Sequence, residues 1–370
     1  MPLDLIPLNQ WFDKFDKPLI IAGPCSAESE EQILSTAKEI EMNEHVQVFR
    51  AGAWKPRTRP YTFEGHGEQA LKWLSEVKKQ SRLLVTTEVA NAEHAELALK
   101  YGIDILWIGA RTTVSPFAVQ EIADVLKGTD IPVLVKNPIN ADLALWIGAL
   151  ERFNGAGIKK LGAIHRGFST AEKTKWRNVP MWTIPIELKR QFPDLPIICD
   201  PSHITGKRSL VGEVCQKSLD VGMDGLMVET HLSPNDAWSD AAQQVTPTSL
   251  KEIITNLHIR ESHSEDKDFG QKLEALRRQI DSIDNEILES LKLRMDIVKE
   301  IGKEKLRNNI TPLQLTRMDS LMKERELKAA SLGLKEKYIS ELFHTIHTES
   351  VKTQTSIMNN FKDDEKNERE

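Results

Sequence analysis

Two kinds of hydrophobic pattern divide the chain. Between residue 18 and about residue 258, short apolar runs alternate with stretches in which apolar residues recur every three or four positions. Near-continuous apolar runs are typical of strands that are buried on both faces, and the wider spacing is typical of amphipathic helices. The first part of the sequence therefore predicts parallel strands joined by crossover helices.

The number of apolar runs favours a closed sheet. The runs are 19–23, 46–52, 83–89, 105–109, 132–136, 161–165, 196–200 and 225–229. Eight strand-and-helix units over about 240 residues fit a (β/α)8 TIM barrel. An open doubly wound sheet is the alternative, but it requires no fixed count of eight. We therefore expect a barrel with its active site at the carboxyl ends of the strands.

The second pattern begins at Leu273, where apolar residues recur with a period of seven. This period predicts one long helix of about 35 residues with a coiled-coil-like seam. Pro312 marks a break, and 313–330 and 337–358 are interpreted as two further helices. The second part of the chain is thus expected to be an all-α domain of three helices.

A cation interrupts the seam of the long helix. Arg294 occupies a position that is otherwise filled by Leu and Ile, and burial of an arginine is costly unless it meets an anion. Arg277 and Lys305 lie close to the same stripe. A plain dimerisation helix does not explain these residues, so we expect three inward-facing cations that bind a dianionic ligand.

Composition agrees with two domains. All eight Trp lie at or before residue 238, and only one of the 17 Pro lies after residue 255. The expected division is a barrel at 1–258, a polar linker at 259–268, a helical domain at 269–358, and a charged, disordered tail at 359–370.

Charge and cysteine content exclude several classes of protein. A net charge of −6 argues against nucleic acid or an anionic membrane as a partner. No apolar run approaches the ~18 residues of a membrane span. Three cysteines cannot form a disulfide framework, and the first ten residues do not resemble a signal peptide. We therefore expect a cytoplasmic protein.

Charged side chains follow almost every predicted strand. The cations at these strand ends are Arg50, Lys55, Arg57, Arg111, Lys136 and Arg166. Such a set suits phosphate and carboxylate groups. A second set contains Cys25, His203 and Glu229, with either Asp236 or Asp240. A mixture of soft, imidazole and hard ligands favours a divalent ion such as Mn, Fe, Co or Zn.

Several sequence motifs lie at these strand ends: GPCSAES (23–29), RAGAWKPRTRPYTFEG (50–65), IGAR (108–111), VKNP (135–138), HRGF (165–168), DPSH (200–203) and VETH with SDAAQQ (228–244). Together they resemble the type I, β-subclass of 3-deoxy-7-phosphoheptulonate (DAHP) synthases. The resemblance implies condensation of phosphoenolpyruvate with erythrose 4-phosphate, the first step of the shikimate pathway.

The resemblance also implies roles for individual residues. The metal ligands are Cys25, His203, Glu229 and Asp240, which selects Asp240 over Asp236. Phosphoenolpyruvate is held by Arg50, Lys55, Arg111, Lys136 and Arg166, with Asp200 beside them. Arg57 and Thr58 bind the phosphate of erythrose 4-phosphate. Lys55 is the expected proton donor, because a lysine among other cations has a lowered pKa.

The second domain resembles the all-helical chorismate mutases. The matching stretches are LEALRRQIDSIDNEIL, LKLRMDIVKEIGKEKL and ELFHTIHTESVKTQ. The resemblance implies rearrangement of chorismate to prephenate in a site shared by two intertwined protomers, hence a homodimer. The implicated residues are Arg277, Arg294, Lys305, Arg317, Ser350 and Gln354. Lys305 and Gln354 stabilise charge on the breaking ether oxygen.

Two positions depart from the mutase pattern. Gln314 and Met318 stand where some relatives carry acids that bind the substrate hydroxyl. Gln314 retains a hydrogen-bonding group and Met318 does not.

Three alternative hypotheses stay open at this point. In the first, the barrel belongs to a related synthase that joins phosphoenolpyruvate to another sugar. In the second, the helical domain only senses chorismate or prephenate and dimerises. The third is allosteric: the helical domain regulates the barrel.

Overall fold

The computed structural model describes residues 2–12, 17–56, 61–171, 173–260 and 266–367. The chain divides into two compact units, Met1–Ser262 and His263–Glu370. None of the described helices is long and apolar enough to cross a membrane.

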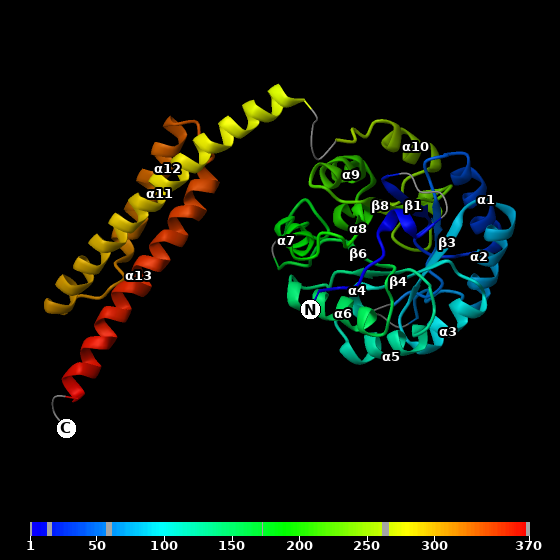
Figure 1. The fold of residues 1–370 in the computed structure, drawn as a ribbon, viewed down its shortest axis with the longest axis horizontal. Helices are drawn as coiled ribbons and strands as arrows, with labels where there is room; N and C mark the ends of the chain where they lie inside the picture. The colour runs from blue at the N-terminus through cyan, green and yellow to red at the C-terminus, as the bar shows by residue number, and fades with distance from the viewer. Residues whose placement is uncertain (1, 13–16, 57–60, 172, 261–265, 368–370) are drawn as a thin grey trace. The chain divides into compact units, whose positions relative to one another are not determined.

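The first unit is the predicted closed barrel of eight parallel strands (Figure 1). The strands are β1 Leu19–Gly23, β2 Val48–Arg50, β3 Leu84–Val89, β4 Ile105–Ile108, β5 Val133–Lys136, β6 Leu161–His165, β7 Ile197–Cys199 and β8 Gly225–Glu229. Each strand pairs with the next in sequence, and β1 pairs with β8 to close the sheet. Every strand lies within one of the predicted apolar runs, because nearly all strand residues are buried.

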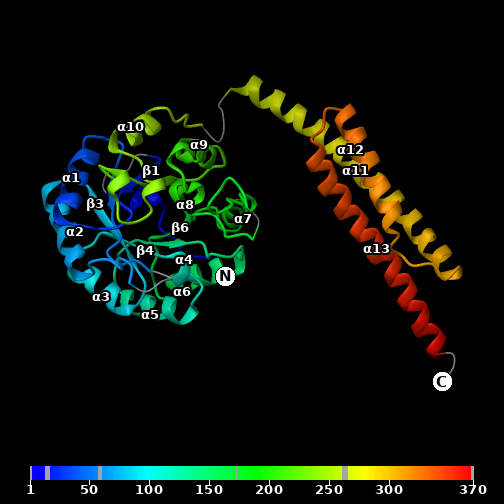
Figure 2. The same cartoon turned by 180° about the vertical axis from the view of Figure 1, so that it is seen from behind.

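Helices surround the barrel, as Figures 1 and 2 show. They are α1 Glu30–Glu41, α2 Glu68–Gln80, α3 Ala92–Lys100, α4 Ala110–Thr113, α5 Pro116–Leu126, α6 Leu143–Gly155, α7 Thr183–Gln191, α8 Pro201–Thr205, α9 Val211–Asp220 and α10 Pro247–Thr255. Short 3-10 turns occur at Leu8–Gln10, Arg208–Leu210, Pro234–Asp236 and Ala241–Gln243. Polar side chains begin several helices: Ser29 and Asn91 accept backbone N–H groups at the starts of α1 and α3.

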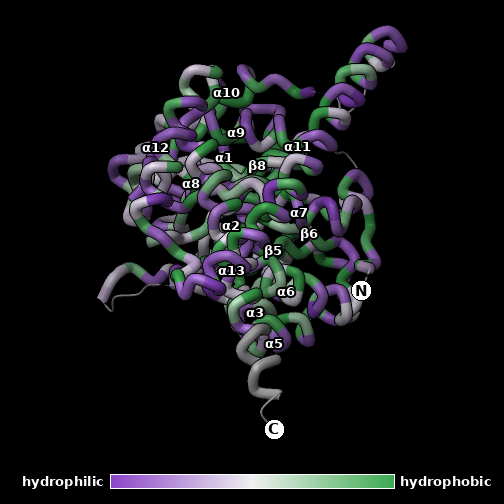
Figure 3. The backbone as a smooth tube through the Cα atoms, turned by 90° about the vertical axis from the view of Figure 1, so that its left-hand side faces the viewer, coloured by the Kyte–Doolittle hydropathy of each residue, from purple (hydrophilic) through white to green (hydrophobic). Residues whose placement is uncertain are grey.

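The barrel has two layers of core. Inward-facing strand residues such as Ile21 and Trp107 pack inside the sheet together with Leu8 and Trp11 of the N-terminal segment. The outward-facing strand residues pack against the helices, whose alternation of hydrophobic and hydrophilic positions is visible in Figure 3. At the end of β1, Gly23 has a φ of +147°, and a Cβ there would overlap the carbonyl oxygen of Arg50. Only glycine allows this close approach of β1 to β2.

The second unit contains the three predicted helices, α11 Lys267–Arg307, α12 Leu315–Ser331 and α13 Glu336–Asn367. Helices α11 and α12 both pack against α13. Helix α13 continues to Asn367 and so includes most of the segment 359–370, for which the sequence predicts disorder. Disorder of the charged tail at 359–370 stays a prediction.

One face of α11 is apolar and uncovered within a single chain. Leu276, Ile280, Ile283 and Ile287 recur along this face, and each side chain is about half exposed, from 49 % to 57 %. Isolated exposed apolar residues are common in proteins, whereas a continuous stripe marks an interaction surface.

Candidate functional site

A cavity of about 430 Å³ opens at the carboxyl ends of the barrel strands. Most of its lining side chains are polar or charged. The lining residues are Lys55, Pro56, Glu88, Ala110, Arg111, Lys136, Ile139, Arg166, Ser169, Arg177, Asn178, His203 and Asp240. The structure therefore brings Lys55, Arg111, Lys136, Arg166, His203 and Asp240 together, as the sequence predicts.

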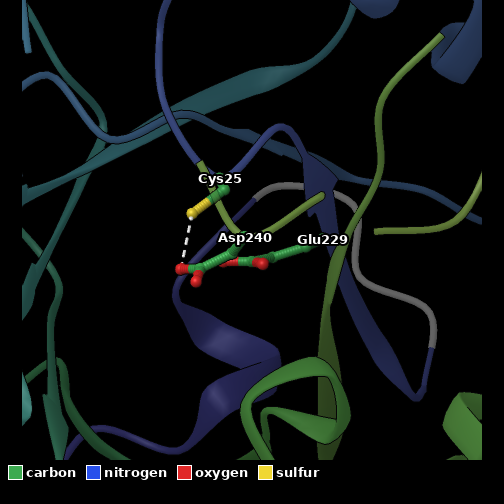
Figure 4. A group of neighbouring side chains, drawn as sticks. All are labelled: Cys25, Glu229 and Asp240. Atoms are coloured by element: carbon green, nitrogen blue, oxygen red, sulfur yellow. Dashed lines mark hydrogen bonds between the residues drawn. The ribbon is translucent and has the colours of Figure 1, made fainter. Parts of the chain in front are cut away.

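Three candidate metal ligands meet at this cavity. Cys25 follows β1, Glu229 ends β8, and Asp240 lies in the connection from β8 to α10. Their ligand atoms all lie within 4.8 Å of one another, and Figure 4 shows the thiol and both carboxylates pointing toward one another. Cys25 Sγ is 3.3 Å from Oδ2 of Asp240. The residues fit a metal, because Oε1 of Glu229 is buried and has no hydrogen-bond partner among the described residues.

His203 lies beside this group but is not one of its three members. Its Nδ1 is 3.0 Å from Oδ1 of Asp200 and 3.7 Å from Oε1 of Glu229. A histidine ligand commonly bonds a carboxylate with one ring nitrogen and the metal with the other. Burial lowers the pKa of His203 despite the neighbouring Asp200, so the ring is neutral at pH 7 and has a lone pair to donate.

Burial and charge set the protonation of the other ligands. Burial, with the nearby charge of Glu229, raises the pKa of the Cys25 thiol to about 12. For Asp240, burial acts to raise the pKa, but the positive charges of Arg177 and Lys55 outweigh it and hold the pKa below its usual range. Asp240 is therefore ionised, while the Cys25 thiol keeps its proton until a cation displaces it.

Lys55 differs from the sequence prediction. Its Nζ is 2.9 Å from Cys25 Sγ, and the carboxylates of Glu229 and Glu88 act on it. Burial acts to lower the pKa of Lys55, but Cys25 and Glu229 raise it above its ordinary value. The expectation of a lowered pKa is wrong, because the nearest groups to Lys55 are anionic or ionisable to anions rather than cationic.

The remaining predicted cations fall into two groups. Arg111, Lys136 and Arg166 line the cavity, and burial lowers the pKa of Arg166 to about 10, which leaves it charged at pH 7. Arg50 is fully buried and does not line the cavity; it is 3.4 Å from Glu229 and lies 4.8 Å from the centre of the Trp107 ring.

Asp200 and the KPRT motif complete the predicted set. Asp200 is buried and forms a 2.8 Å ion pair with Lys136 as well as its contacts with His203. Burial acts to raise its pKa, but His203 and Lys136 hold the pKa well below the usual range. Arg57 and Thr58 lie outside the described residues.

Sequence reasoning missed two residues beside the ligands. Arg177, in the connection from β6 to α7, donates to Asp240 at 2.9 Å and to Oε1 of Gln243 at 2.6 Å. Gln243 in turn donates to Oε2 of Glu229 at 2.7 Å. Arg177 and Gln243 thus connect two carboxylate ligands. Neither follows a strand directly, so the strand-end pattern gives no signal for them.

In the helical unit, the structure brings part of the predicted mutase set together. Arg294 of α11 donates to the hydroxyl of Ser350 of α13 at 2.6 Å. Gln354, one turn further along α13, is 7 % exposed, and its Oε1 has no partner among the described residues. Lys305 donates to the carbonyl oxygen of Pro312 at 2.7 Å.

Arg277 does not join this group within one chain. Its side chain is 62 % exposed and lies 3.7 Å from Glu274. Seventeen residues separate it from Arg294, or about 25 Å along the helix at 1.5 Å per residue. Within one chain Arg277 therefore does not face the group around Arg294, and its role in substrate binding stays a prediction. Arg317 of α12 is also exposed, and Gln314 is the residue that precedes α12.

Comparison with known proteins covers both units. Residues 13–264 match the DAHP synthetase I family, and residues 276–355 match chorismate mutase type II. A phospho-2-dehydro-3-deoxyheptonate aldolase of Thermotoga maritima is 34 % identical over 239 residues, which cover 64 % of this chain and 68 % of that protein. A 2-dehydro-3-deoxyphosphooctonate aldolase of Wolinella succinogenes is 26 % identical over 263 residues, covering 65 % and 97 %.

A solved structure agrees with the barrel. The crystal structure of the Thermotoga maritima DAHP synthase has a TM-score of 0.58 and 32 % identity, and it covers 64 % of this chain and 67 % of that chain. The eight-stranded barrel, the candidate ligand group and the two family matches agree. The chain therefore belongs to the DAHP synthetase I family and continues into a chorismate mutase type II domain, which makes it a bifunctional transferase and isomerase of the shikimate pathway.

Proposed function

We propose that the barrel holds a divalent metal through Cys25, His203, Glu229 and Asp240 and condenses phosphoenolpyruvate with erythrose 4-phosphate beside it. The observation that carries this proposal is the group of three ligand atoms within 4.8 Å at the edge of a cation-lined cavity. Thiolate, imidazole and carboxylate ligands together favour Mn, Fe, Co or Zn over Mg or Ca. When bound, such an ion supplies a Lewis acid for the aldehyde oxygen.

The cations of the cavity position the substrates. Arg111, Lys136 and Arg166 supply the positive charge that a phosphate and a carboxylate require, and the arginines allow bidentate contacts. Two phosphorylated substrates repel each other, so a cationic cavity holds them at reacting distance and offsets that repulsion. Arg50 contacts the metal ligand Glu229 and neutralises part of its negative charge. The family resemblance assigns Arg57 and Thr58 to the phosphate of erythrose 4-phosphate.

Lys55 is the proposed proton donor. It lines the cavity, and its raised pKa keeps the ammonium group protonated at neutral pH. The proton is therefore available at Nζ, 2.9 Å from Cys25 Sγ and next to the site where the aldehyde oxygen gains charge.

In the helical domain we propose that Arg294, Ser350, Lys305 and Gln354 bind chorismate and promote its rearrangement. The rearrangement is intramolecular, so the protein needs no nucleophile and has only to clamp the two carboxylates and stabilise the developing charge. Gln354 is assigned to the second task because the Nε2–H group of its buried amide is a neutral donor. Arg317 and Gln314 are assigned to substrate binding by resemblance alone.

We also propose a homodimer through the helical domain. Arg277 lies too far from Arg294 to share a ligand within one chain, and the apolar stripe of α11 that begins at Leu276 is uncovered. A second copy that packs on this stripe buries the apolar residues and supplies Arg277 in trans. Mixing Arg277→Ala chains with Arg294→Ala chains tests this: restored mutase activity supports a shared site, and an inactive mixture of exchanged subunits contradicts it.

The substrate assignment is tested with the full chain. We expect product with erythrose 4-phosphate and none with arabinose 5-phosphate, because the barrel is 34 % identical to the heptulosonate enzyme and 26 % identical to the octulosonate enzyme. Prephenate formation that disappears in Gln354→Ala separates a catalytic helical domain from a sensor. Turnover of arabinose 5-phosphate alone, or no prephenate formation, contradicts the respective assignment.

The three buried cysteines are all free, which supports the proposal of a cytoplasmic location. Fractionation of the cells that make the protein tests it.

A further inference from the structure

We propose that Glu28 is a positioning residue of the metal site. Its side chain holds the two loops that carry Cys25 and Asp240 at the distance that a shared ion requires. The inference rests on the metal site proposed above. Glu28 lies three residues after Cys25, in the connection from β1 to α1, and is 5 % exposed. It is not among the described residues that line the cavity, so it acts through other residues.

The carboxylate of Glu28 joins the two loops directly. Its Oε1 accepts the backbone N–H of Trp238 at 2.8 Å and the hydroxyl of Ser26 at 3.2 Å. The hydroxyl of Ser26 is in turn 2.5 Å from the hydroxyl of Ser239. Ser26 and Ser239 are the immediate neighbours of the ligands Cys25 and Asp240. A single buried carboxylate therefore holds both the segment next to Cys25 and the segment next to Asp240.

A third loop meets the same residue. His66 Nε2 lies 3.0 Å from the carbonyl oxygen of Glu28, and the His66 ring packs against Phe63 with ring centres 5.2 Å apart. Phe63 packs edge-on against Trp238 at 5.1 Å. These contacts tie the connection from β2 to α2, which also carries Lys55, to the loop that carries Asp240.

The ligands need this support. Asp240 has a φ of 49°, in the left-handed region, and a residue without the freedom of glycine stays in that conformation only where its surroundings hold it there. A buried carboxylate is itself costly unless donors surround it. The N–H of Ser233 donates to Nδ1 of His231, so the other ring nitrogen carries the proton, and it lies 3.7 Å from Oε2 of Glu28. That separation is longer than a hydrogen bond, so among the described residues the donors to the Glu28 carboxylate are the N–H of Trp238 and the hydroxyl of Ser26, one from each loop.

The test is titration of Co²⁺ into the metal-free full chain, read by the thiolate-to-cobalt charge-transfer band and by the Kd. Residues that orient metal ligands commonly contribute tenfold or more to affinity. We expect Glu28→Ala to raise the Kd for Co²⁺ by about tenfold or more and to weaken the band. The Kd of Glu28→Gln for Co²⁺ is expected to lie between those of the wild type and Glu28→Ala, because the amide oxygen of glutamine still accepts the N–H of Trp238.

Thr36→Val is the matched control. Thr36 is a buried polar residue of α1 whose hydroxyl donates to the carbonyl oxygen of Gln32 and forms no hydrogen bond with Glu28 or with the described ligands. We expect this variant to lose stability and to bind Co²⁺ as the wild type does. We expect the mutase activity of each variant to be unchanged. This activity therefore serves as a measure of the concentration of folded chain in each sample.

A folded Glu28→Ala chain that binds Co²⁺ with the wild-type Kd and band overturns the inference. If Glu28→Ala does not fold, wild-type binding by both Glu28→Gln and Ser239→Ala overturns it equally. Failure of the proposed metal site is distinguishable, because in that case the wild-type chain itself shows no thiolate-to-cobalt band.

Discussion

Gly302 of α11 faces Gln354 of α13 with no side chain between the two helices. A Cβ at this position would lie 3.3 Å from Cγ and 3.4 Å from Cα of Gln354, and 3.1 Å from Cδ1 of Ile357. These separations are tighter than ordinary carbon contacts, so valine at position 302 would push the Gln354 turn away from α11. Overpacking of this kind costs about 1–3 kcal/mol, part of which is offset because valine is a better helix former than glycine by a few tenths of a kcal/mol.

We therefore expect Gly302→Val to fold with modestly reduced helical stability and to lose much more activity than stability. A displacement of about 1 Å in a catalytic group lowers turnover by about a hundredfold. The assay is prephenate formation, alongside thermal unfolding followed by circular dichroism. Gly270→Val is the matched control, because Gly270 lies in the same helix with nothing within 4 Å of its Cβ.

Synthase activity is an internal reference in both variants, since residue 302 belongs to the second compact unit. Wild-type mutase turnover in a folded Gly302→Val chain would refute the assignment of Gln354 to catalysis. Equal losses in Gly302→Val and Gly270→Val would show that helix stability, rather than the position of Gln354, determines the activity.

Three further predictions concern the barrel. Trp fluorescence reports the unfolding of the barrel, because all eight Trp lie at or before residue 238. Lys136→Met leaves the buried carboxylate of Asp200 without its 2.8 Å partner, so the free energy of unfolding should fall by about 3–5 kcal/mol, and an unchanged urea midpoint contradicts this. Burial lowers the pKa of His165 to about 3 from 6.5, so the unfolded chain binds more protons between these values. Stability should therefore fall below pH 6.5, by up to about 1.4 kcal/mol per pH unit, and His165→Leu should reduce this slope in urea unfolding; an unchanged slope would contradict it. Lys55→Met should abolish synthase turnover and leave mutase turnover intact, and near-normal synthase turnover would exclude Lys55 as the proton donor.

The barrel and much of its site could be predicted because the same apolar runs that predict the strands also mark the strand ends, where the site residues lie. Strands buried on both faces must be apolar throughout, so a charged residue such as Glu229 at the end of a run stands out. Parallel strands place such residues on one rim, which brings Cys25, Glu229 and Lys136 to the same end of the barrel.

The remaining features depend on side-chain directions and long connections. Arg177 lies in an irregular connection and Gln243 in a three-residue 3-10 turn, where no periodicity relates a residue to the site. The raised pKa of Lys55 follows from its 2.9 Å contact with Cys25, which the order of cations along the chain does not reveal. Arg277 lies close to the helical stripe that contains Arg294, but the distance along α11 separates them within one chain.

The central claim is that one chain carries a metal-dependent reaction in its barrel and a metal-independent reaction in its helices. Both activities measured on the same full-length sample before and after chelation test this claim most directly. We expect chelation to abolish condensation of phosphoenolpyruvate with erythrose 4-phosphate, to leave prephenate formation unchanged, and added Mn²⁺, Co²⁺ or Zn²⁺ to restore the first activity. Condensation that persists in metal-free protein, or mutase activity lost together with it, would contradict the account.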